Sequence, residues 1–291
     1  MAQRLVGAGF QIAVFDVRRD AVERFVAQHS DATAAESFTE LARTSDAVIT
    51  MLPDGEVVRR VALGADNHAD DRLLGALRPG SVVIDMSSSS PTGTQALGRD
   101  LAAHGIDMID APVSGGVARA ETGALSIMVG GDAAVIDRCR AVFAALGEHI
   151  FATGPLGSGH ALKALNNLVS AAGLIAAVEA LLIGRRFGLD PGAMIDVFNA
   201  STARNNSTEN KFKQFVLSGT FASGFSLDLM VKDLATAVEL AHATGTPAPF
   251  SVECRKLWTA AHAQLAPGAD HTAVVQWFEA VTGTTLKREE G

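Results

Sequence analysis

The chain has 291 residues, of which 48% are hydrophobic and 19% are charged, and its formal net charge is −8. A chain of this length is expected to form two domains, and its apolar content excludes a disordered chain. The acidic balance and the dispersed lysines and arginines argue against nucleic acid as a partner.

Local patterns exclude several further classes of protein. No uninterrupted apolar run reaches the roughly 18 to 20 residues that span a bilayer, and the opening MAQRLVGAGF lacks the features of a secretory signal. Cys139 and Cys254 are single and distant, which indicates neither a disulfide framework nor a zinc site. The eight histidines show no spacing typical of metal ligands. We therefore expect a soluble cytoplasmic protein that has neither a metal nor a membrane partner.

The first half of the chain alternates strand-like and helix-like segments. Apolar, β-rich runs predict strands, and segments with apolar residues on one face predict helices. The predicted strands are 11–16, 47–52, 81–86, 107–113, 125–129 and 149–152. The predicted helices are 19–28, 92–104 and 133–146. Strands that alternate with helices favour a doubly wound parallel sheet of the Rossmann type.

The pattern changes after Gly159, where a long apolar segment over 160–187 begins. Further helical stretches are predicted at 191–199, 208–217, 227–244, 250–265 and 272–281. The second half is therefore predicted to be all-helical. Glycine and proline cluster at 154–159, so we expect a first domain at 1–156 and a second at 157–291.

Four segments carry a resemblance to a known family. They are DMSSSSP (85–91), DAPVSGG (110–116), GSGHALKALNN (157–167) and KDL (232–234), supported by MLP (51–53) and GALSIMVGG (123–131). Together they resemble the β-hydroxyacid dehydrogenases, which include 3-hydroxyisobutyrate dehydrogenase, tartronate semialdehyde reductase and glyoxylate/succinic semialdehyde reductases. The resemblance implies a Rossmann NAD(P)-binding domain, then a helical substrate and dimerisation domain that begins with a long interdomain helix. It also implies hydride transfer between a nicotinamide cofactor and a short β-hydroxy acid or semialdehyde.

The family normally opens with a strand and a GxGxxG turn, whose backbone N–H groups hold the pyrophosphate. This sequence contains no GxGxxG, and its first 16 residues look like the helix and second strand that follow such a turn. We therefore expect an N-terminally truncated Rossmann domain that lacks its central strand, with Met1 as an internal methionine. The hypothesis requires an in-frame strand and GxGxxG upstream of Met1.

Lys163 is the predicted general acid/base. It lies in an apolar segment, 161–184, whose only other charge is Glu179. A lysine in such a segment is costly to bury, although a lysine near a helix start can also extend into solvent. The resemblance implies that Lys163 exchanges a proton with the substrate oxygen during hydride transfer. Asn167 shares its helix face and is predicted to bind substrate or hold the lysine, and Asn166 is the weaker candidate.

Ser114, Gly115 and Gly116 follow a predicted strand. A serine and two glycines at a strand end expose backbone N–H groups that can receive a carboxylate, although an ordinary turn has the same composition. The resemblance implies that this loop binds the acid group of the substrate. It further implies that Phe225 and Asp233 border the substrate.

Asp16 is the predicted selector of the cofactor. A carboxylate at the end of the second strand can bind the adenosine ribose hydroxyls and disfavour a 2′-phosphate, which favours NAD. Aspartate also caps helices, and Arg18 and Arg19 nearby could accommodate NADP. NAD is therefore the expected cofactor, with NADP as the alternative.

Four further residues complete the predicted cofactor site. Leu52 and Pro53 close a strand and would line the cofactor, and Ser88 matches the family residue beside the nicotinamide. Lys232 matches the family lysine near the nicotinamide end, although an exposed helix charge would have the same appearance. All four assignments are implied by the resemblance.

Three alternatives remain open. Imine reductases share the fold but commonly have aspartate or tyrosine in place of the lysine, and a 6-phosphogluconate dehydrogenase type would need basic residues for a phosphate. An inactive dimeric relic or binding module without a working dinucleotide site is the third. The small residues in SAAGLIAAVEALL allow close helix packing, and the resemblance implies a homodimer or homotetramer.

Overall fold

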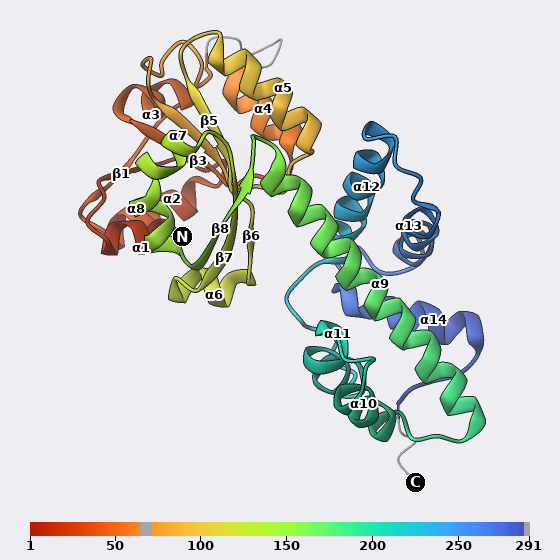
Figure 1. Ribbon diagram of the computed structural model, residues 1–291. Coiled ribbons are helices and arrows are strands. Elements are labelled where there is room, and N and C mark those ends of the chain that lie inside the picture. The colour runs from red at the N-terminus through yellow and green to blue at the C-terminus, as the bar shows by residue number, and fades with distance from the viewer. Residues whose placement is uncertain (65–70, 288–291) are drawn as a thin grey trace. The chain divides into compact units, whose positions relative to one another are not determined.

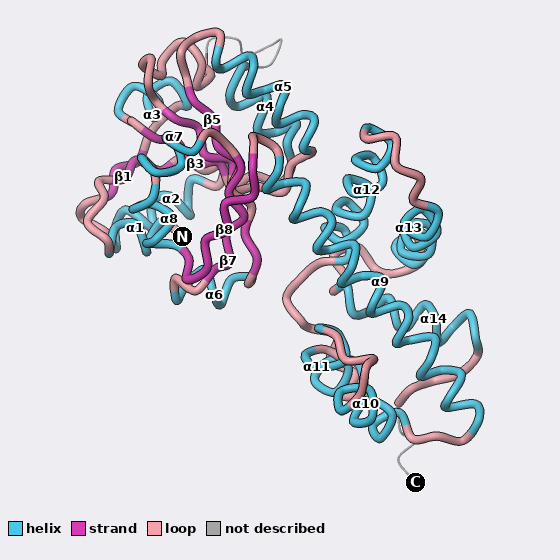
Figure 2. Tube along the Cα trace, in the orientation of Figure 1, coloured by secondary structure: helices cyan, strands magenta, loops and turns pink. Residues whose placement is uncertain are grey.

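The computed structural model describes residues 1–64 and 71–287. Its internal contacts divide it into two compact units, Met1–Lys163 and Ala164–Gly291. Among the described residues, strands occur only in the first unit, as Figure 2 shows. The predicted fold class, a Rossmann-type sheet domain followed by a helical domain, is confirmed. The division falls inside the long helix α9 (Ser158–Phe187), and the predicted boundary between residues 156 and 157 lies just before that helix.

The strands of the first unit form two separate sheets. Strands β1 (Ile12–Val14) and β2 (Ala32–Ala34) pair in parallel with each other. The larger sheet has the order β3-β4-β5-β7-β6, with β8 paired to β7. Its strands are β3 (Ala47–Thr50), β4 (Val82–Asp85), β5 (Asp107–Asp110), β6 (Val113–Ser114), β7 (Leu125–Gly130) and β8 (Gly147–Gly154). Pairing is parallel except where β7 meets β5 and β6. Within the described residues, no strand joins β1 to β3.

Helices cover both faces of the larger sheet (Figure 1). The helices of this unit are α1 (Ala2–Gly7), α2 (Arg19–Gln28), α3 (Phe38–Thr44), α4 (Gly55–Leu63), α5 (Pro91–Ala102), α6 (Gly116–Thr122), α7 (Ala133–Arg138) and α8 (Arg140–Leu146). Side chains of a strand point alternately to opposite faces. Ile84 and Ile109 therefore share a core with α1 and α8, while Val83 and Met108 share the opposite core with α4 and α5.

Several element bounds differ from those predicted. The predicted strand 107–113 is divided into β5 and β6, because Pro112 between them has no N–H for a ladder hydrogen bond. The predicted helix 133–146 is divided into α7 and α8 at Cys139, whose backbone leaves the helical region (φ −95°, ψ 3°). Four short elements, none longer than nine residues, escaped prediction, namely β2, α3, α4 and α6.

The second unit is built around α9. Buried residues recur along it with helical spacing, as at Leu174, Val178 and Leu181, and they pack into one core with Trp258 and Phe278. The remaining helices are α10 (Pro191–Ala200), α11 (Asn206–Asn210), a π-helix (Phe212–Val216), α12 (Leu227–Ala243), α13 (Pro249–His262), a 3-10 helix (His271–Ala273) and α14 (Val274–Thr282). The predicted helix 208–217 is thus α11 followed by the π-helix, and Asn205 caps α11.

Helix α9 is long and apolar enough, by length and composition alone, to cross a membrane. Core helices of soluble proteins pass the same test, and half of its most apolar window is buried inside the protein. Its place in the core of the second unit accounts for its apolar composition.

Candidate active site

The carboxyl ends of the parallel strands β3, β4 and β5 lie along one edge of the larger sheet. In open α/β sheets, ligands bind outside this edge. The half-buried Leu52 follows β3, and the half-buried Ser88 follows β4. Met51 and Pro53 are exposed beside Leu52, so the first loop offers an apolar surface. Leu52, Pro53 and Ser88, predicted from separate motifs, therefore lie at the same edge.

Asp85 orders the serine-rich loop that contains Ser88. Its Oδ1 accepts hydrogen bonds from Thr50 Oγ1 (2.9 Å) and Ser87 N (3.0 Å), and its Oδ2 accepts one from Ser89 Oγ (2.7 Å). Ser87 Oγ in turn accepts a bond from Leu52 N (2.9 Å). Ser87 and Ser89 are buried in these interactions, so Ser88 is the more accessible of the three serines.

Asp16 lies just beyond β1 and is exposed. Its Oδ1 accepts a hydrogen bond from Arg18 N (2.8 Å), which fixes the carboxylate at the strand end. Arg19 lies with its guanidinium 5.3 Å from the centre of the Phe15 ring and pairs with Glu36 at 3.3 Å. Arg18 and Arg19 are the two arginines that could bind the 2′-phosphate of NADP. Of these, Arg19 already interacts with Phe15 and Glu36.

Ser114, Gly115 and Gly116 join β6 to α6. Ser114 ends β6 and is half-buried, while both glycines are exposed. Gly115 and Gly116 have φ angles of 136° and 67°, which L-amino acids with side chains rarely adopt. The two glycines therefore set the turn that leads into α6, and this turn lies at the surface.

Lys163 lies in the second turn of α9 and is only 9% exposed. Asn167 follows one turn later on the same face and is 7% exposed. Its Nδ2 donates a hydrogen bond of 2.5 Å to Asp233 Oδ2 on α12, and Asp233 is also buried. The neighbouring Asn166 is exposed and donates to Asn167 Oδ1 (3.2 Å). The second unit thus brings together Asn167 and Asp233, two predicted residues 66 positions apart.

Comparison with known proteins identifies the family. Residues 1–154 match the family model described as the NAD binding domain of 6-phosphogluconate dehydrogenase. Residues 157–278 match the model described as NAD-binding of NADP-dependent 3-hydroxyisobutyrate dehydrogenase. The 2-(hydroxymethyl)glutarate dehydrogenase of Eubacterium barkeri is 35% identical, over 98% of this chain and 93% of that protein. The chain belongs to the β-hydroxyacid dehydrogenase family.

Two further relatives fit this family. The NAD-dependent L-serine dehydrogenase of Pseudomonas aeruginosa is 33% identical over 97% of this chain and 95% of its own. The solved structure of Mycobacterium tuberculosis 3-hydroxyisobutyrate dehydrogenase with L-serine superposes with a TM-score of 0.85. That structure is 33% identical and covers 94% of this chain and 93% of its own. This hydroxyacid dehydrogenase is therefore an oxidoreductase whose cofactor is NAD or NADP.

The structure adds a cluster that the sequence analysis of this dehydrogenase missed. Asp85, Asp110 and His160, which come from β4, β5 and the first turn of α9, are buried together. The ring nitrogens of His160 lie 3.8 Å from Asp85 Oδ2 and 3.7 Å from Asp110 Oδ2. Burial raises the pKa of Asp110, while the charge of His160 and backbone N–H groups act in the opposite direction. The signal was present, because each aspartate ends an apolar strand where a charge is costly to bury.

Phe225 lies two residues before the start of α12, Lys232 lies within α12, and both are half-buried. The Phe225 ring packs edge-on against His271 at 5.6 Å between centroids, and the Phe225 carbonyl accepts a bond from His271 N (2.8 Å). Lys211, in the same unit, donates to Ser170 Oγ at 3.4 Å, and burial lowers its pKa. The roles predicted for Phe225 and Lys232 remain predictions.

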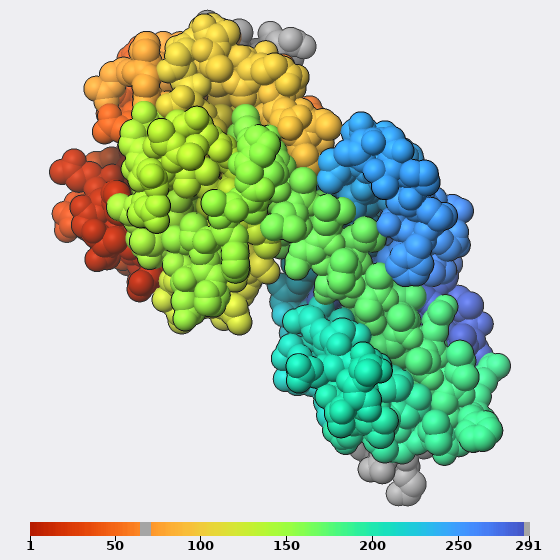
Figure 3. Space-filling model, viewed as in Figure 1, coloured from red at the N-terminus to blue at the C-terminus, as the bar shows by residue number. Residues whose placement is uncertain are grey.

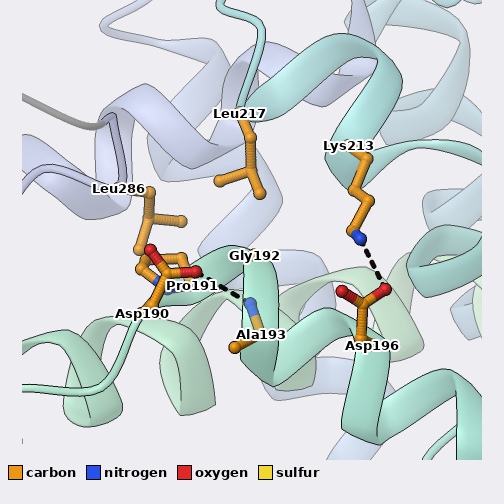
Figure 4. Close-up of a pocket in the computed structure, with 8 residues that line it drawn as sticks. All are labelled: Asp190, Pro191, Gly192, Ala193, Asp196, Lys213, Leu217 and Leu286. Carbon is orange, nitrogen blue, oxygen red and sulfur yellow. Dashed lines mark hydrogen bonds and ion pairs between the residues drawn. The ribbon is translucent and has the colours of Figure 1, made fainter. Parts of the chain in front are cut away.

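A surface pocket of about 390 Å³ lies in the helical unit of this dehydrogenase, and none of the residues that line it is a predicted site residue. Figure 4 shows its lining, in which Lys213 forms an ion pair with Asp196. Asp190 Oδ1 accepts a hydrogen bond from Ala193 N (2.9 Å) at the start of α10. Its charged groups thus serve local structure, and we assign it no ligand.

Proposed function

We propose that this protein transfers hydride between NAD and a short β-hydroxy acid or its semialdehyde, with Lys163 as the general acid/base. The burial of Lys163 carries the proposal. Removing an ammonium group from water costs free energy. A role of the group in the reaction accounts for that cost. Asn167, one turn along the same helix, supplies a polar group beside it.

Lys163 and Asn167 divide the work on the substrate oxygen. As an amine, Lys163 accepts the hydroxyl proton during oxidation, and as an ammonium it returns a proton to the carbonyl oxygen during reduction. The Asn167 amide has two N–H donors, and its bond to Asp233 uses one of them. The other N–H can donate to the substrate. Asp233 therefore sets the orientation of the Asn167 amide.

The residues at the strand ends fit a nicotinamide dinucleotide. A bound dinucleotide supplies the hydride acceptor. The exposed carboxylate of Asp16 suits the ribose hydroxyls and disfavours a 2′-phosphate. Leu52 and Pro53 offer an apolar surface, and Ser88 and Lys232 are assigned to the nicotinamide end. No GxGxxG occurs in the sequence, so we assign the pyrophosphate no residue.

The substrate class follows from the names of the relatives. 2-(Hydroxymethyl)glutarate, L-serine and 3-hydroxyisobutyrate each carry a hydroxymethyl group on the carbon next to a carboxylate. We assign the carboxylate to the backbone N–H groups around Ser114, Gly115 and Gly116, because the positive φ angles of the glycines present them at the start of α6. Phe225 and Asp233 would border the group that distinguishes one substrate from another.

We further infer a homodimer or larger homo-oligomer. Side chains of α9 reach the surface in Figure 3, and apolar ones recur along it with helical spacing. They are Leu162, Leu165, Val169, Ile183 and Phe187. A row of exposed apolar side chains is typical of a protein–protein interface.

We place the protein in the cytoplasm, because its buried cysteines are free thiols.

The test compares the variants Lys163→Met and Lys163→Arg with the natural sequence. Rates of NAD reduction are measured with 3-hydroxyisobutyrate, 2-(hydroxymethyl)glutarate and L-serine, and NAD binding is measured separately by thermal shift. Methionine has no exchangeable proton and arginine does not release one, so kcat should fall by about 10²–10⁴-fold in both. NAD binding should be unchanged.

The matched control is Lys256→Met, which removes an exposed lysine on α13. It should leave kcat within about twofold, as expected for a surface change. Retention of most of the activity in Lys163→Met would overturn the assignment of the proton transfer. Absence of activity on all three acids in the natural sequence would overturn the substrate class.

A further inference from the structure

We propose that His160 is a positioning residue for the reaction, which fixes the first turn of α9 and thereby the place of Lys163. The inference rests on the proposed function, because it gives the buried Asp85–His160–Asp110 cluster a role in proton transfer. His160 lies three residues before Lys163 on α9, so both side chains leave the same side of the helix.

The His160 ring is fixed from two other elements. Its Nε2 lies 3.1 Å from the carbonyl oxygen of Ser87, and because a carbonyl only accepts, Nε2 carries a proton. Its Nδ1 lies 2.9 Å from Thr94 Oγ1 on α5. The ring is 2% exposed and has carboxylates on both sides. The imidazole thus joins the loop after β4, helix α5 and the start of α9.

Asp110 fixes the backbone of the same turn. Its Oδ1 accepts a bond from Gly157 N and its Oδ2 one from His160 N, both at 2.7 Å. N–H groups at a helix start have no partner within the helix, and a carboxylate there is also favoured by the helix dipole. Asp110 therefore acts as the cap of α9, although it belongs to a strand 47 residues away from Gly157.

The glycines of this region allow the close approach. A Cβ at Gly159 would lie 2.3 Å from Met128 O, and a Cβ at Gly130 would lie 2.5 Å from Asp110 Oδ1. Either contact is far below van der Waals distance. The helix start therefore lies against the strand backbone with no room for a side chain, and it cannot shift without losing the bonds to Asp110.

A reacting group must be held within about 0.5 Å of its productive position. Lys163 has four rotatable side-chain bonds, so its place depends on its backbone and on the packing around it. Replacement of a buried polar network by apolar residues of similar size is often neutral for stability. Because stability often does not require such a network, we assign the cluster the role of holding Lys163 in position. That role depends on the direction of each hydrogen bond.

The test compares His160→Leu with His160→Gln. Leucine removes both ring hydrogen bonds, whereas the glutamine amide keeps an N–H donor for Ser87 O. In His160→Leu, kcat for the hydroxy acid should fall by about 10²-fold, with the dissociation constant of NAD unchanged. His160→Gln should recover at least a tenth of the natural kcat. The control His104→Leu removes an exposed histidine and should leave kcat unchanged.

A folded His160→Leu variant with the natural kcat would overturn the proposal, and so would a kcat loss that glutamine does not rescue. If His160→Leu does not fold, Thr94→Val gives the same information, since it removes one hydroxyl and keeps the imidazole. Its kcat should fall about tenfold at unchanged NAD affinity, and an unchanged kcat would overturn the proposal.

A second readout separates this proposal from the proposed function. The rate of reductive methylation of Lys163, followed by mass spectrometry, reports the surroundings of its amine without turnover. The rate should change at least several-fold in His160→Leu and return toward the natural value in His160→Gln. If the natural protein oxidises no hydroxy acid, the proposed function fails. The methylation rates then still decide whether His160 positions Lys163, and equal rates would refute it.

Discussion

The buried Asn167 of α9 donates a hydrogen bond of 2.5 Å to the buried carboxylate of Asp233 on α12. An aspartate carboxylate only accepts hydrogen bonds, so this contact determines which end of the amide faces Asp233. This bond joins two helices of the same unit, and together with the bond that Asn167 Oδ1 accepts from Asn166 it orients the amide. Both residues were predicted as substrate-binding residues from separate motifs.

Replacement of Asp233 by alanine should destabilise the helical unit. Removal of the acceptor leaves a buried N–H without its partner, which costs about 1–3 kcal/mol. A double-mutant cycle with Asn167→Ala, measured by urea unfolding, should give an interaction energy of about 1.5–3 kcal/mol, as for a hydrogen bond to a charged group. Additive effects of the two changes would contradict this. Asn166→Ala, at the exposed neighbour, should change stability by less than about 0.5 kcal/mol.

Asp16→Asn should shift cofactor preference from NAD toward NADP. The asparagine oxygen can keep the bond from Arg18 N, so the turn is retained while the negative charge is lost. We expect the ratio of kcat/KM for NADP to that for NAD to rise by at least about tenfold. In thermal unfolding, NAD at 100 times its dissociation constant should stabilise the natural protein by about 2.7 kcal/mol. An unchanged ratio would remove Asp16 from the cofactor site.

Stability should fall below neutral pH because of His271. Burial, and to a lesser extent the charge of Lys211, lower its pKa from 6.5 to about 4, while Asp270 opposes the shift. As pH falls from 6.5 toward 4, the unfolded chain binds a proton that the folded chain does not, so the stability present above pH 6.5 is lost. One proton gives a slope of at most about 1.4 kcal/mol per pH unit.

His271→Phe should flatten this dependence, because phenylalanine keeps an aromatic ring against Phe225 and Trp258 but binds no proton. The measurement is the free energy of unfolding in urea at several values between pH 4.5 and 7. The control His242→Phe replaces an exposed histidine of α12. Parallel curves for His271→Phe and the natural protein would show that His271 does not cause the loss.

Val169→Glu should dissociate the proposed oligomer. Val169 is 72% exposed in the middle of the apolar row on α9, and a glutamate there would be buried without a partner in an interface. Sedimentation velocity should show a dimer or larger species for the natural protein and a monomer for the variant. Ala144→Glu, which adds the same charge on α8, should leave the mass unchanged. A natural protein that sediments as a monomer would end the oligomer proposal.

Local sequence patterns were sufficient to predict the order of the main helices and strands. Apolar runs such as 82–84 and 127–129 are buried on both faces, so their strands can be predicted without any tertiary information. The elements β2, α3, α4 and α6 are at most nine residues long, and Pro112 and Cys139 interrupt segments whose apolar pattern is continuous. Those bounds depend on packing and on backbone angles that a pattern of apolar residues does not contain.

The sequence by itself determined the two-part fold, the family, and a set of candidate residues at strand ends and on one helix face, because period and motif are local properties. Only the tertiary structure decided that Asn167 meets Asp233 and that Asp110 caps α9. It alone showed that His160 lies between two carboxylates. These partners are 47 to 75 residues apart, and a hydrogen bond between them depends on the separation and direction of two atoms. Spacing along a chain does not specify that geometry; the packing of strands and helices does.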